Sequence, residues 1–221
     1  MTVALMLKTI QTEAVSAMGM SDERLIIFLK APRLGLVKTR LAKTMGVEAA
    51  CMAYRQMLTT LVDNVGALSG VELRFAPDDA ESEIQPWLRS GWQTRPQGEG
   101  NLGQKLCRAF SDAHSAGAKR VVIIGSDCPE VSAADIREAW TALKNHDVVV
   151  GPATDGGYWL VGLRQPQPQL FQGIRWSSET VLAETLQRAK SSQLRIELLR
   201  ILADVDTEKD WREFLDSSPR P

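Results

Sequence analysis

The sequence lacks a long hydrophobic run, since no apolar stretch approaches the roughly 20 residues that a membrane span requires. Residues 1–20 have a lysine and scattered apolar residues but no sustained hydrophobic core, so a signal peptide is not expected there. An excess of one charge is also lacking, because the formal net charge is −1. Nothing therefore marks the whole protein as a nucleic-acid binder, and any positive potential must be local.

Cysteine motifs are absent as well. The three cysteines, Cys51, Cys107 and Cys128, lie far apart and form no C-x-x-C pair, which argues against a disulfide framework or a structural zinc site. Reduced thiols in a cytoplasmic protein are the expected state. No histidine lies near Cys128 in the sequence, so we interpret Cys128 as a packing residue and not as a nucleophile.

What the chain does contain is an alternation of strand and helix patterns. Periodicity predicts strands over 24–30, 71–75, 92–95, 120–125, 147–151, 158–163 and 194–199, and helices over 38–45, 47–68, 81–89, 102–116, 133–144, 179–190 and 208–215. This alternation predicts βαβ units with a largely parallel sheet. No linker of low complexity divides the chain, so we expect one domain over 23–217, after an N-terminal extension (1–22) that is helical or disordered.

A cluster of cations follows the first predicted strand. The segment K-A-P-R-L-G-L-V-K-T-R combines a loop containing proline and glycine with Lys30, Arg33, Lys38 and Arg40. Loop amides, a helix N-terminus and these cations suit phosphate oxygens. The P-loop pattern G-x-x-x-x-G-K-[ST] is absent. The position after the first strand of an α/β sheet favours phosphate binding over the alternative, a solvated basic turn.

The strand predicted over 120–125 has four β-branched residues and is followed by a single acidic residue, Asp127. Such a strand suits the middle of a parallel sheet, and ligands of these sheets bind beyond the carboxyl ends of the strands. Mg²⁺ is often held by one or two carboxylates together with substrate phosphates. We therefore expect Asp127 to be a metal ligand, with a turn or helix-cap aspartate as the alternative.

The glycine-rich segment G-E-G-N-L-G at 98–103 satisfies the pattern G-x-G-x-x-G. A dinucleotide fingerprint follows a buried apolar strand, whereas the residues before Gly98 are polar and include Pro96. We interpret Gly98 and Gly100 as parts of a loop that closes over a ligand, with ordinary turn chemistry as the alternative.

Two further acidic segments occur in the C-terminal half. In D-G-G-Y at 155–158, the paired glycines allow either a close backbone approach to a ligand or a hairpin turn. In D-V-D at 204–206, two carboxylates on one side of an extended segment either complete the metal site begun by Asp127 or start the following helix. Trp176, in a loop before a predicted helix, is a candidate contact on the acceptor side.

Together these stretches resemble a family of bacterial transferases associated with radical-SAM or selenium-domain genes (DUF2064-like). That family is similar to 2-phospho-lactate guanylyltransferase and to the GT-A nucleotide-diphospho-sugar transferases. The family motifs K-x-P-x-x-G-x-V-K-T-R-L, G-S-D-C-P, D-G-G-Y and D-x-D-T-x-x-D are matched at 30–41, 125–129, 155–158 and 204–210. One departure is Asn101, which stands where the family's glycine loop commonly has aspartate.

The resemblance implies a single-domain α/β fold of the GT-A type, a three-layer sandwich with a mostly parallel central sheet. It also implies a metal-dependent transferase that uses an activated nucleotide, first of all a nucleotide-sugar glycosyltransferase acting on a small-molecule acceptor. The alternatives are a guanylyltransferase-like nucleotidyltransferase that couples an NTP to a small phosphorylated acceptor, and a non-catalytic nucleotide-binding module. Neither a nucleic acid nor a membrane is expected as a partner, and a homodimer is left open.

The resemblance also assigns roles to particular residues. Asp127 and Lys38 would be catalytic, and Asp127 and Asp206 would hold Mg²⁺ or Mn²⁺. The implied nucleotide contacts are Lys30, Pro32, Arg33, Gly35, Lys38, Arg40, Gly98 and Gly100. The implied contacts to the acceptor or sugar are Asn101, Asp155, Gly156, Gly157, Tyr158 and Trp176.

Overall fold

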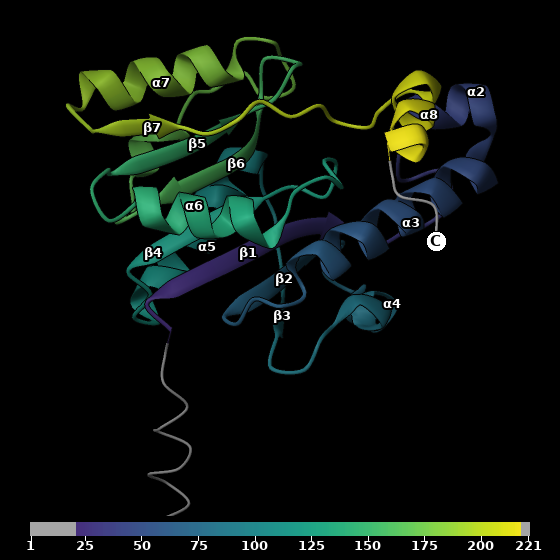
Figure 1. Cartoon of the computed structure of the whole chain (residues 1–221), viewed down its shortest axis with the longest axis horizontal. Coiled ribbons are helices and arrows are strands. Elements are labelled where there is room, and N and C mark those ends of the chain that lie inside the picture. Colours follow the sequence, from purple (N-terminus) through teal and green to yellow (C-terminus); the bar gives the residue numbers. More distant parts are fainter. Residues whose placement is uncertain (1–20, 218–221) are drawn as a thin grey trace, which may run out of the picture.

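A single mixed sheet organises the protein (Figure 1), whose computed structural model describes residues 21–217. Within these residues the sheet has seven strands in the order β3-β2-β1-β4-β6-β5-β7, and only β6 runs antiparallel to its neighbours. The predicted α/β fold with a mostly parallel sheet is confirmed. The strands are β1 (Glu23–Lys30), β2 (Val71–Ala76), β3 (Gln93–Pro96), β4 (Arg120–Ile124), β5 (Val148–Pro152), β6 (Tyr158–Leu163) and β7 (Ile196–Leu198).

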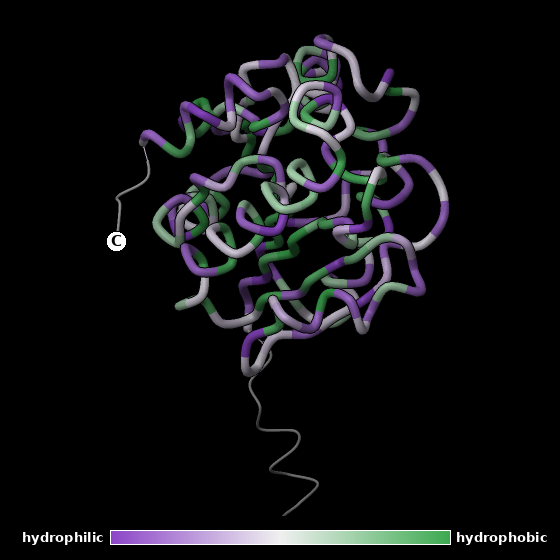
Figure 2. The backbone as a smooth tube through the Cα atoms, turned by 90° about the vertical axis from the view of Figure 1, so that its right-hand side faces the viewer, coloured by the Kyte–Doolittle hydropathy of each residue, from purple (hydrophilic) through white to green (hydrophobic). Residues whose placement is uncertain are grey.

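Helices cover both faces of the sheet, which completes the predicted three layers. Helices α3 (Val47–Val65) and α6 (Ala133–Ala142) pack on one face, and α5 (Leu102–Ser115) and α7 (Val181–Ser191) pack on the other. A third apolar cluster joins α3 to α2 (Thr39–Met45) and α8 (Glu208–Ser217), which lie together in Figure 1. In Figure 2 the segments that cross the interior are largely green and the outer turns are largely purple.

Strand β4 occupies the central position that its composition predicts. It pairs in parallel with β1 and antiparallel with β6, and Val121–Ile124 are almost completely buried. Val121 and Ile123 face α5 and α7, whereas Val122 and Ile124 face α3 and α6. Because both faces of the strand are covered, each of its four apolar side chains has a packing role.

Several element boundaries differ from the sequence-based expectation. The helix expected over 81–89 is a short α4 (Glu81–Ile84) followed by a 3-10 turn, Gln85–Trp87, because Pro86 has no amide hydrogen to continue the α-helix. The last strand, expected over 194–199, shrinks to β7, and a further 3-10 turn covers Pro168–Leu170. Residues 1–20 of the expected N-terminal extension lie outside the described residues, so the domain limits stay a prediction. Among the described residues, no helix is long and apolar enough to cross a membrane.

Candidate active site

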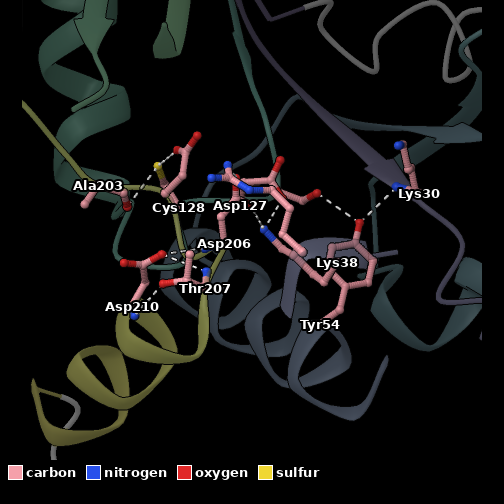
Figure 3. Close-up of polar contacts among 12 residues, drawn as sticks. Lys30, Lys38, Tyr54, Asp127, Cys128, Ala203, Asp206, Thr207 and Asp210 are labelled. Atoms are coloured by element: carbon pink, nitrogen blue, oxygen red, sulfur yellow. Dashed lines mark hydrogen bonds and ion pairs between the residues drawn. The ribbon is translucent and has the colours of Figure 1, made fainter. Parts of the chain in front are cut away.

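Asp127 lies just beyond the carboxyl end of β4, where its side chain meets Lys38, a cation contributed by the segment after β1 (Figure 3). The Lys38 Nζ atom lies 2.5 Å from Asp127 Oδ1 and 3.0 Å from Asp206 Oδ1. Arg40 Nη1 lies 3.2 Å from the other carboxylate oxygen of Asp206. The fold therefore brings the N-terminal basic segment, the central strand end and the segment before α8 to one place.

Lys38 is the most constrained member of this cluster. Its side chain is only 4% exposed, and its backbone has a φ of 45°, in the left-handed region immediately before α2 begins. Burial alone would lower the pKa of Lys38, but attraction to Asp127 and Asp206 outweighs burial, so the pKa is raised. The Lys38 ammonium is therefore a fixed positive charge at the strand ends.

A buried tyrosine ties the two neighbouring strand ends together. Tyr54, on α3, accepts a hydrogen bond from the backbone amide of Lys30 at 3.0 Å, and its hydroxyl lies 3.0 Å from Ser126 Oγ. Burial raises the pKa of Tyr54, so the hydroxyl stays protonated. Because Ser126 directly precedes Asp127, this contact fixes the turn that carries the acidic side chain.

The segment before α8 carries a further, half-buried carboxylate, that of Asp204. Cys128 Sγ donates to Asp204 Oδ1 at 2.7 Å, and the Val205 amide donates to the Asp127 carbonyl at 2.9 Å. Burial, together with repulsion from nearby carboxylates such as Asp127, raises the pKa of Asp204 to about 6. Burial also raises the pKa of the Cys128 thiol. A protonated, buried Cys128 supports its interpretation as a packing residue.

The start of α8 is capped without using the side chain of Asp206. Asp210 Oδ2 accepts from the backbone amides of Asp206 and Thr207, and Thr207 Oγ1 accepts from the Asp210 amide (Figure 3). The Asp206 carboxylate is thus left to Lys38 and Arg40. The start of the helix is therefore capped by Thr207 and Asp210. The Asp206 side chain belongs instead to the charged cluster around Lys38.

A cavity of about 490 Å³ opens at these strand ends. Six of the site residues suggested by the sequence line it: Lys30, Lys38, Arg40, Asp127, Tyr158 and Asp206. The cavity also includes polar residues that the sequence did not single out for a functional role, namely Thr39, Tyr54, Gln97, Ser126 and Ser177. An apolar part of the wall comes from the α5 face of the sheet, through Phe28, Leu106, Ile123 and Val161.

The rest of the basic segment lies elsewhere. Arg33 forms ion pairs with Asp79 at 2.9 Å and Glu83 at 2.6 Å, so its guanidinium already has two carboxylate partners. The carbonyl of Pro32 accepts a hydrogen bond from Cys51 Sγ at 3.0 Å, and Gly35 adopts a φ of +73° in the turn. The described residues that line the cavity do not include Pro32, Arg33 or Gly35. Their suggested nucleotide contacts stay a prediction.

The glycine-rich loop is held in place by internal hydrogen bonds. Arg108 donates to the carbonyls of Gln97 and Glu99, and Gly98 and Gly100 have positive φ values. Asn101 caps α5: its Oδ1 accepts from the Gln104 amide at 3.0 Å, while Gln104 Oε1 accepts from the Asn101 amide at 2.9 Å. Aspartate and asparagine are both good N-caps, so this capping role explains why an asparagine can stand at position 101 in place of the family's aspartate.

Gly100, Asn101 and Trp176 line a second depression, of about 820 Å³, and not the main cavity. This depression lies along the first two turns of α5 and includes Arg108 and Phe171. The three residues suggested as ligand contacts are therefore together, but they are separate from Lys38 and Asp127 in the described structure.

The D-G-G-Y segment is the hairpin connection between β5 and β6. Asp155 Oδ1 accepts from the Gly157 amide at 2.8 Å. A Cβ atom on Gly156 (φ +87°) would lie 2.2 Å from the carbonyl oxygen of Glu179, so only glycine fits there. Tyr158 lines the main cavity, and its buried hydroxyl faces Thr185 of α7 without a hydrogen bond of good geometry among the described residues.

Gln97 and Tyr54 are two of the cavity residues that sequence patterns did not reveal. The Gln97 amide nitrogen donates to the carbonyls of Leu29 and Arg74, at 3.0 and 3.1 Å, and so joins the ends of β1 and β2. Tyr54 occupies an apolar position of an amphipathic helix, where a core residue is the ordinary expectation. Neither residue type stands out in the sequence, because each acts through contacts that only the fold creates.

The donor atoms at the strand ends suit a hard divalent cation. The carboxylates of Asp127 and Asp206 already converge on one ammonium nitrogen. No cluster of three or more His, Cys, Asp or Glu residues arranged for metal binding occurs within residues 21–217. Two carboxylates supplemented by ligand phosphates form a common Mg²⁺ environment. The residues present therefore fit Mg²⁺ or Mn²⁺ held jointly by the protein and a phosphate-bearing ligand.

The fold and the ionic cavity at its strand ends place the protein in the class of nucleotide-diphospho-sugar transferase-like proteins. The chain belongs to the family described as uncharacterized proteins conserved in bacteria (DUF2064), whose pattern matches residues 62–178. This membership confirms the resemblance found in the sequence motifs. A search of curated proteins finds no match.

Solved structures support the same fold. A protein from Desulfovibrio desulfuricans G20, provisionally described as a nucleotide-diphospho-sugar transferase, is 32% identical with a TM-score of 0.80, over 85% of this chain and 83% of that chain. CMP:2-keto-3-deoxy-manno-octonic acid synthetase complexed with CTP is 12% identical with a TM-score of 0.55, over 89% and 99%. Rv0371c from Mycobacterium tuberculosis H37Rv, complexed with manganese, is 16% identical with a TM-score of 0.53, over 89% and 99%.

Proposed function

We propose that this protein is a metal-dependent transferase that uses an activated nucleotide, first of all a glycosyltransferase that moves a sugar from a nucleotide-sugar to a small-molecule acceptor. The observation that carries the proposal is the cluster of Lys38, Arg40, Asp127 and Asp206 at the carboxyl ends of β1 and β4. Charged ligands of α/β sheets bind at such an edge. The Desulfovibrio relative, provisionally described as a nucleotide-diphospho-sugar transferase, supports the choice of donor.

The roles follow from charge and position. Lys38 and Arg40 would neutralise phosphate oxygens of the donor, and Asp127 and Asp206 would hold Mg²⁺ or Mn²⁺. When bound, the metal supplies additional neutralisation of charge on the leaving phosphate. Tyr54 and Ser126 fix the turn that carries Asp127. Catalysis would thus rest on positioning and electrostatic stabilisation.

Nucleotidyl transfer is the second candidate. The CTP-bound synthetase, which shares the fold, supports an NTP as donor. The small phosphorylated acceptor follows from the resemblance to guanylyltransferases in the sequence motifs. The two reactions differ in the product, because glycosyl transfer releases a nucleoside diphosphate and nucleotidyl transfer releases pyrophosphate. A non-catalytic nucleotide-binding module would release neither. Three free cysteines, two of them buried, support the proposal of a cytoplasmic protein.

A ligand screen followed by product analysis tests these proposals. The purified protein is heated with each NTP and with nucleotide-sugars, with and without Mg²⁺ or Mn²⁺. A ligand at 100 times its Kd adds about 2.7 kcal/mol to the free energy of unfolding, which corresponds to a rise in Tm of about 5–10 °C for a domain of this size. If no nucleotide raises the Tm with or without metal, the proposal is wrong. For ligands that bind, release of pyrophosphate or nucleoside diphosphate separates the two reactions.

Substitution of Asp127 tests the site itself. Asp127→Asn removes a negative charge from the cluster, and we expect turnover to fall by at least about 100-fold. Asp63→Asn is the matched control, since Asp63 is similarly exposed (57% against 52%) and also pairs with a cation, Arg89. Circular dichroism of both variants checks the fold. Equal turnover of the Asp127→Asn and Asp63→Asn variants would contradict the assignment.

A further inference from the structure

We propose that Lys38 is an internal counter-ion that keeps divalent metal away from Asp127 and Asp206 until a phosphate-bearing ligand binds. The inference rests on the proposed function, because it concerns the two carboxylates assigned there to metal binding. It adds an order to the binding events: the phosphate-bearing ligand and the metal enter together, and metal alone binds weakly.

The contacts show that three of the four carboxylate oxygens already have a cationic partner. Lys38 Nζ lies within 3.0 Å of both Asp127 Oδ1 and Asp206 Oδ1. The second oxygen of Asp206 is taken by Arg40 at 3.2 Å. Two carboxylates therefore face two cations, and the group as a whole has no net charge for a metal ion to neutralise. A divalent ion would add two positive charges beside two that are already present.

Lys38 has little freedom to leave while the cavity holds no anion. Its side chain is almost fully buried, and its backbone is fixed in the left-handed turn before α2. Within the part of the chain that the structure describes, its charged partners are these two carboxylates. Removal of the ammonium from both, without a new anion, would leave a buried charge unpaired, which is costly. Phosphate oxygens in the cavity would supply that new partner.

The arrangement makes metal and phosphate ligand depend on each other. Phosphates attract Lys38 and Arg40, which line the same cavity, and so release oxygens of Asp127 and Asp206 for a metal. By thermodynamic linkage, the phosphate ligand and the metal each increase the affinity for the other by the same factor. Lys38 is thus assigned a positioning role that sets this coupling, in addition to its contact with phosphate.

A titration with Mn²⁺ alone tests the inference, with free Mn²⁺ followed by electron paramagnetic resonance and no nucleotide present. In the Lys38→Met variant the two carboxylates lose their shared cation, so we expect Mn²⁺ to bind about tenfold tighter or more than in the wild type. The double variant Lys38→Met/Asp127→Asn should lose that gain, which assigns the bound ion to this site. Lys43→Met, which removes an exposed lysine from α2, the helix that follows Lys38, should leave Mn²⁺ affinity unchanged.

Arg40→Gln provides a second variant that does not depend on a buried position, because the Arg40 side chain is 69% exposed. It should tighten Mn²⁺ binding less than Lys38→Met does, since Arg40 pairs with Asp206 alone among the carboxylates of residues 21–217. Equal Mn²⁺ affinity of the wild type and both variants overturns the inference. This outcome is distinct from failure of the proposed function, which is judged by nucleotide binding and product release in the wild-type protein.

Discussion

Replacement of Tyr54 by phenylalanine isolates the contact that fixes the turn before Asp127. The change removes one buried oxygen and keeps the ring, so packing in the core is preserved. The lost hydroxyl accepts from the Lys30 amide and bonds Ser126 Oγ, both at 3.0 Å. The part-buried Lys30 amide and the buried Ser126 hydroxyl would each lose this partner. Leaving a buried donor or acceptor unsatisfied costs about 1–3 kcal/mol.

We therefore expect the free energy of unfolding of Tyr54→Phe to fall by about 2 kcal/mol. For a domain of this size that corresponds to a fall in Tm of about 4–8 °C. Urea denaturation gives the free energy and differential scanning calorimetry gives the Tm. The slope of the urea transition should stay unchanged, because the same surface is exposed on unfolding.

The chain provides its own control, since it has only two tyrosines. The Tyr158 hydroxyl is also buried, but its contact with Thr185 does not reach good hydrogen-bond geometry in the described structure. Removal of an unsatisfied buried hydroxyl should be neutral or stabilising, so Tyr158→Phe should change the free energy of unfolding by less than about 0.5 kcal/mol or increase it. If Tyr54→Phe loses no more stability than Tyr158→Phe, the role given to Tyr54 is refuted.

Two further predictions concern a buried charge, Arg74, and a half-buried one, Asp204. Arg74, whose side chain is 1% exposed, contacts Glu72 at 2.5 Å and Asp112 at 2.8 Å, so Arg74→Met should lower the free energy of unfolding in urea by about 3–5 kcal/mol. Arg89→Met, at an exposed position, should lower the free energy of unfolding by less than about 1 kcal/mol. Similar losses for the Arg74 and Arg89 variants would contradict this reasoning. The pKa of Asp204 is raised to about 6, so its charged form destabilises the folded state above that pH, and protonation relieves the penalty as pH falls toward about 4. Asp204→Asn should therefore raise the Tm at about pH 8 and lose that advantage by about pH 4; a Tm difference independent of pH would contradict the assignment.

The order of elements could be read from the sequence because local signals agree with the fold. The apolar β-branched run of β4 predicts a strand buried on both faces, and the structure places it at the centre of the sheet. The capping pair Ser132 and Asp135 marks the start of α6, and both of its reciprocal hydrogen bonds form. These signals depend on neighbouring residues alone, so tertiary contacts are not needed to see them.

The order of the strands was not readable in the same way. Strand β6 lies between β4 and β5, although it follows both in the sequence. The short connection over residues 153–157 makes β5 and β6 an antiparallel hairpin, but a hairpin can join the sheet through either of its strands. The choice depends on how Val161 and Leu163 pack with Val121 and Ile123 in the core, which a pattern along the chain does not encode.

The sequence predicts which residues meet at the site more completely than it predicts which partner each side chain contacts. The rule that ligands bind beyond the carboxyl ends of strands correctly joins Lys38 to Asp127. The same rule does not distinguish Lys38 from Arg33, which lies in the same basic segment. Arg33 turns to Glu83 on α4, and nothing near Arg33 in the sequence announces that acidic partner. Long side chains choose among distant partners, and only the assembled surface determines which one lies within reach.

The backbone of Lys38 gives an independent reason to regard the cluster as functional. A residue other than glycine, asparagine or aspartate is uncommon in the left-handed region, where it costs about 1–2 kcal/mol. Glycine or asparagine at position 38 would form the turn before α2 more easily, yet a lysine is present at a φ of 45°. Its contacts with Asp127 and Asp206 offset part of that cost, but a buried ion pair by itself contributes little net stability. Lys38 therefore combines a strained backbone with a buried charge at the edge where ligands bind. A role in binding explains this combination better than a contribution to stability does.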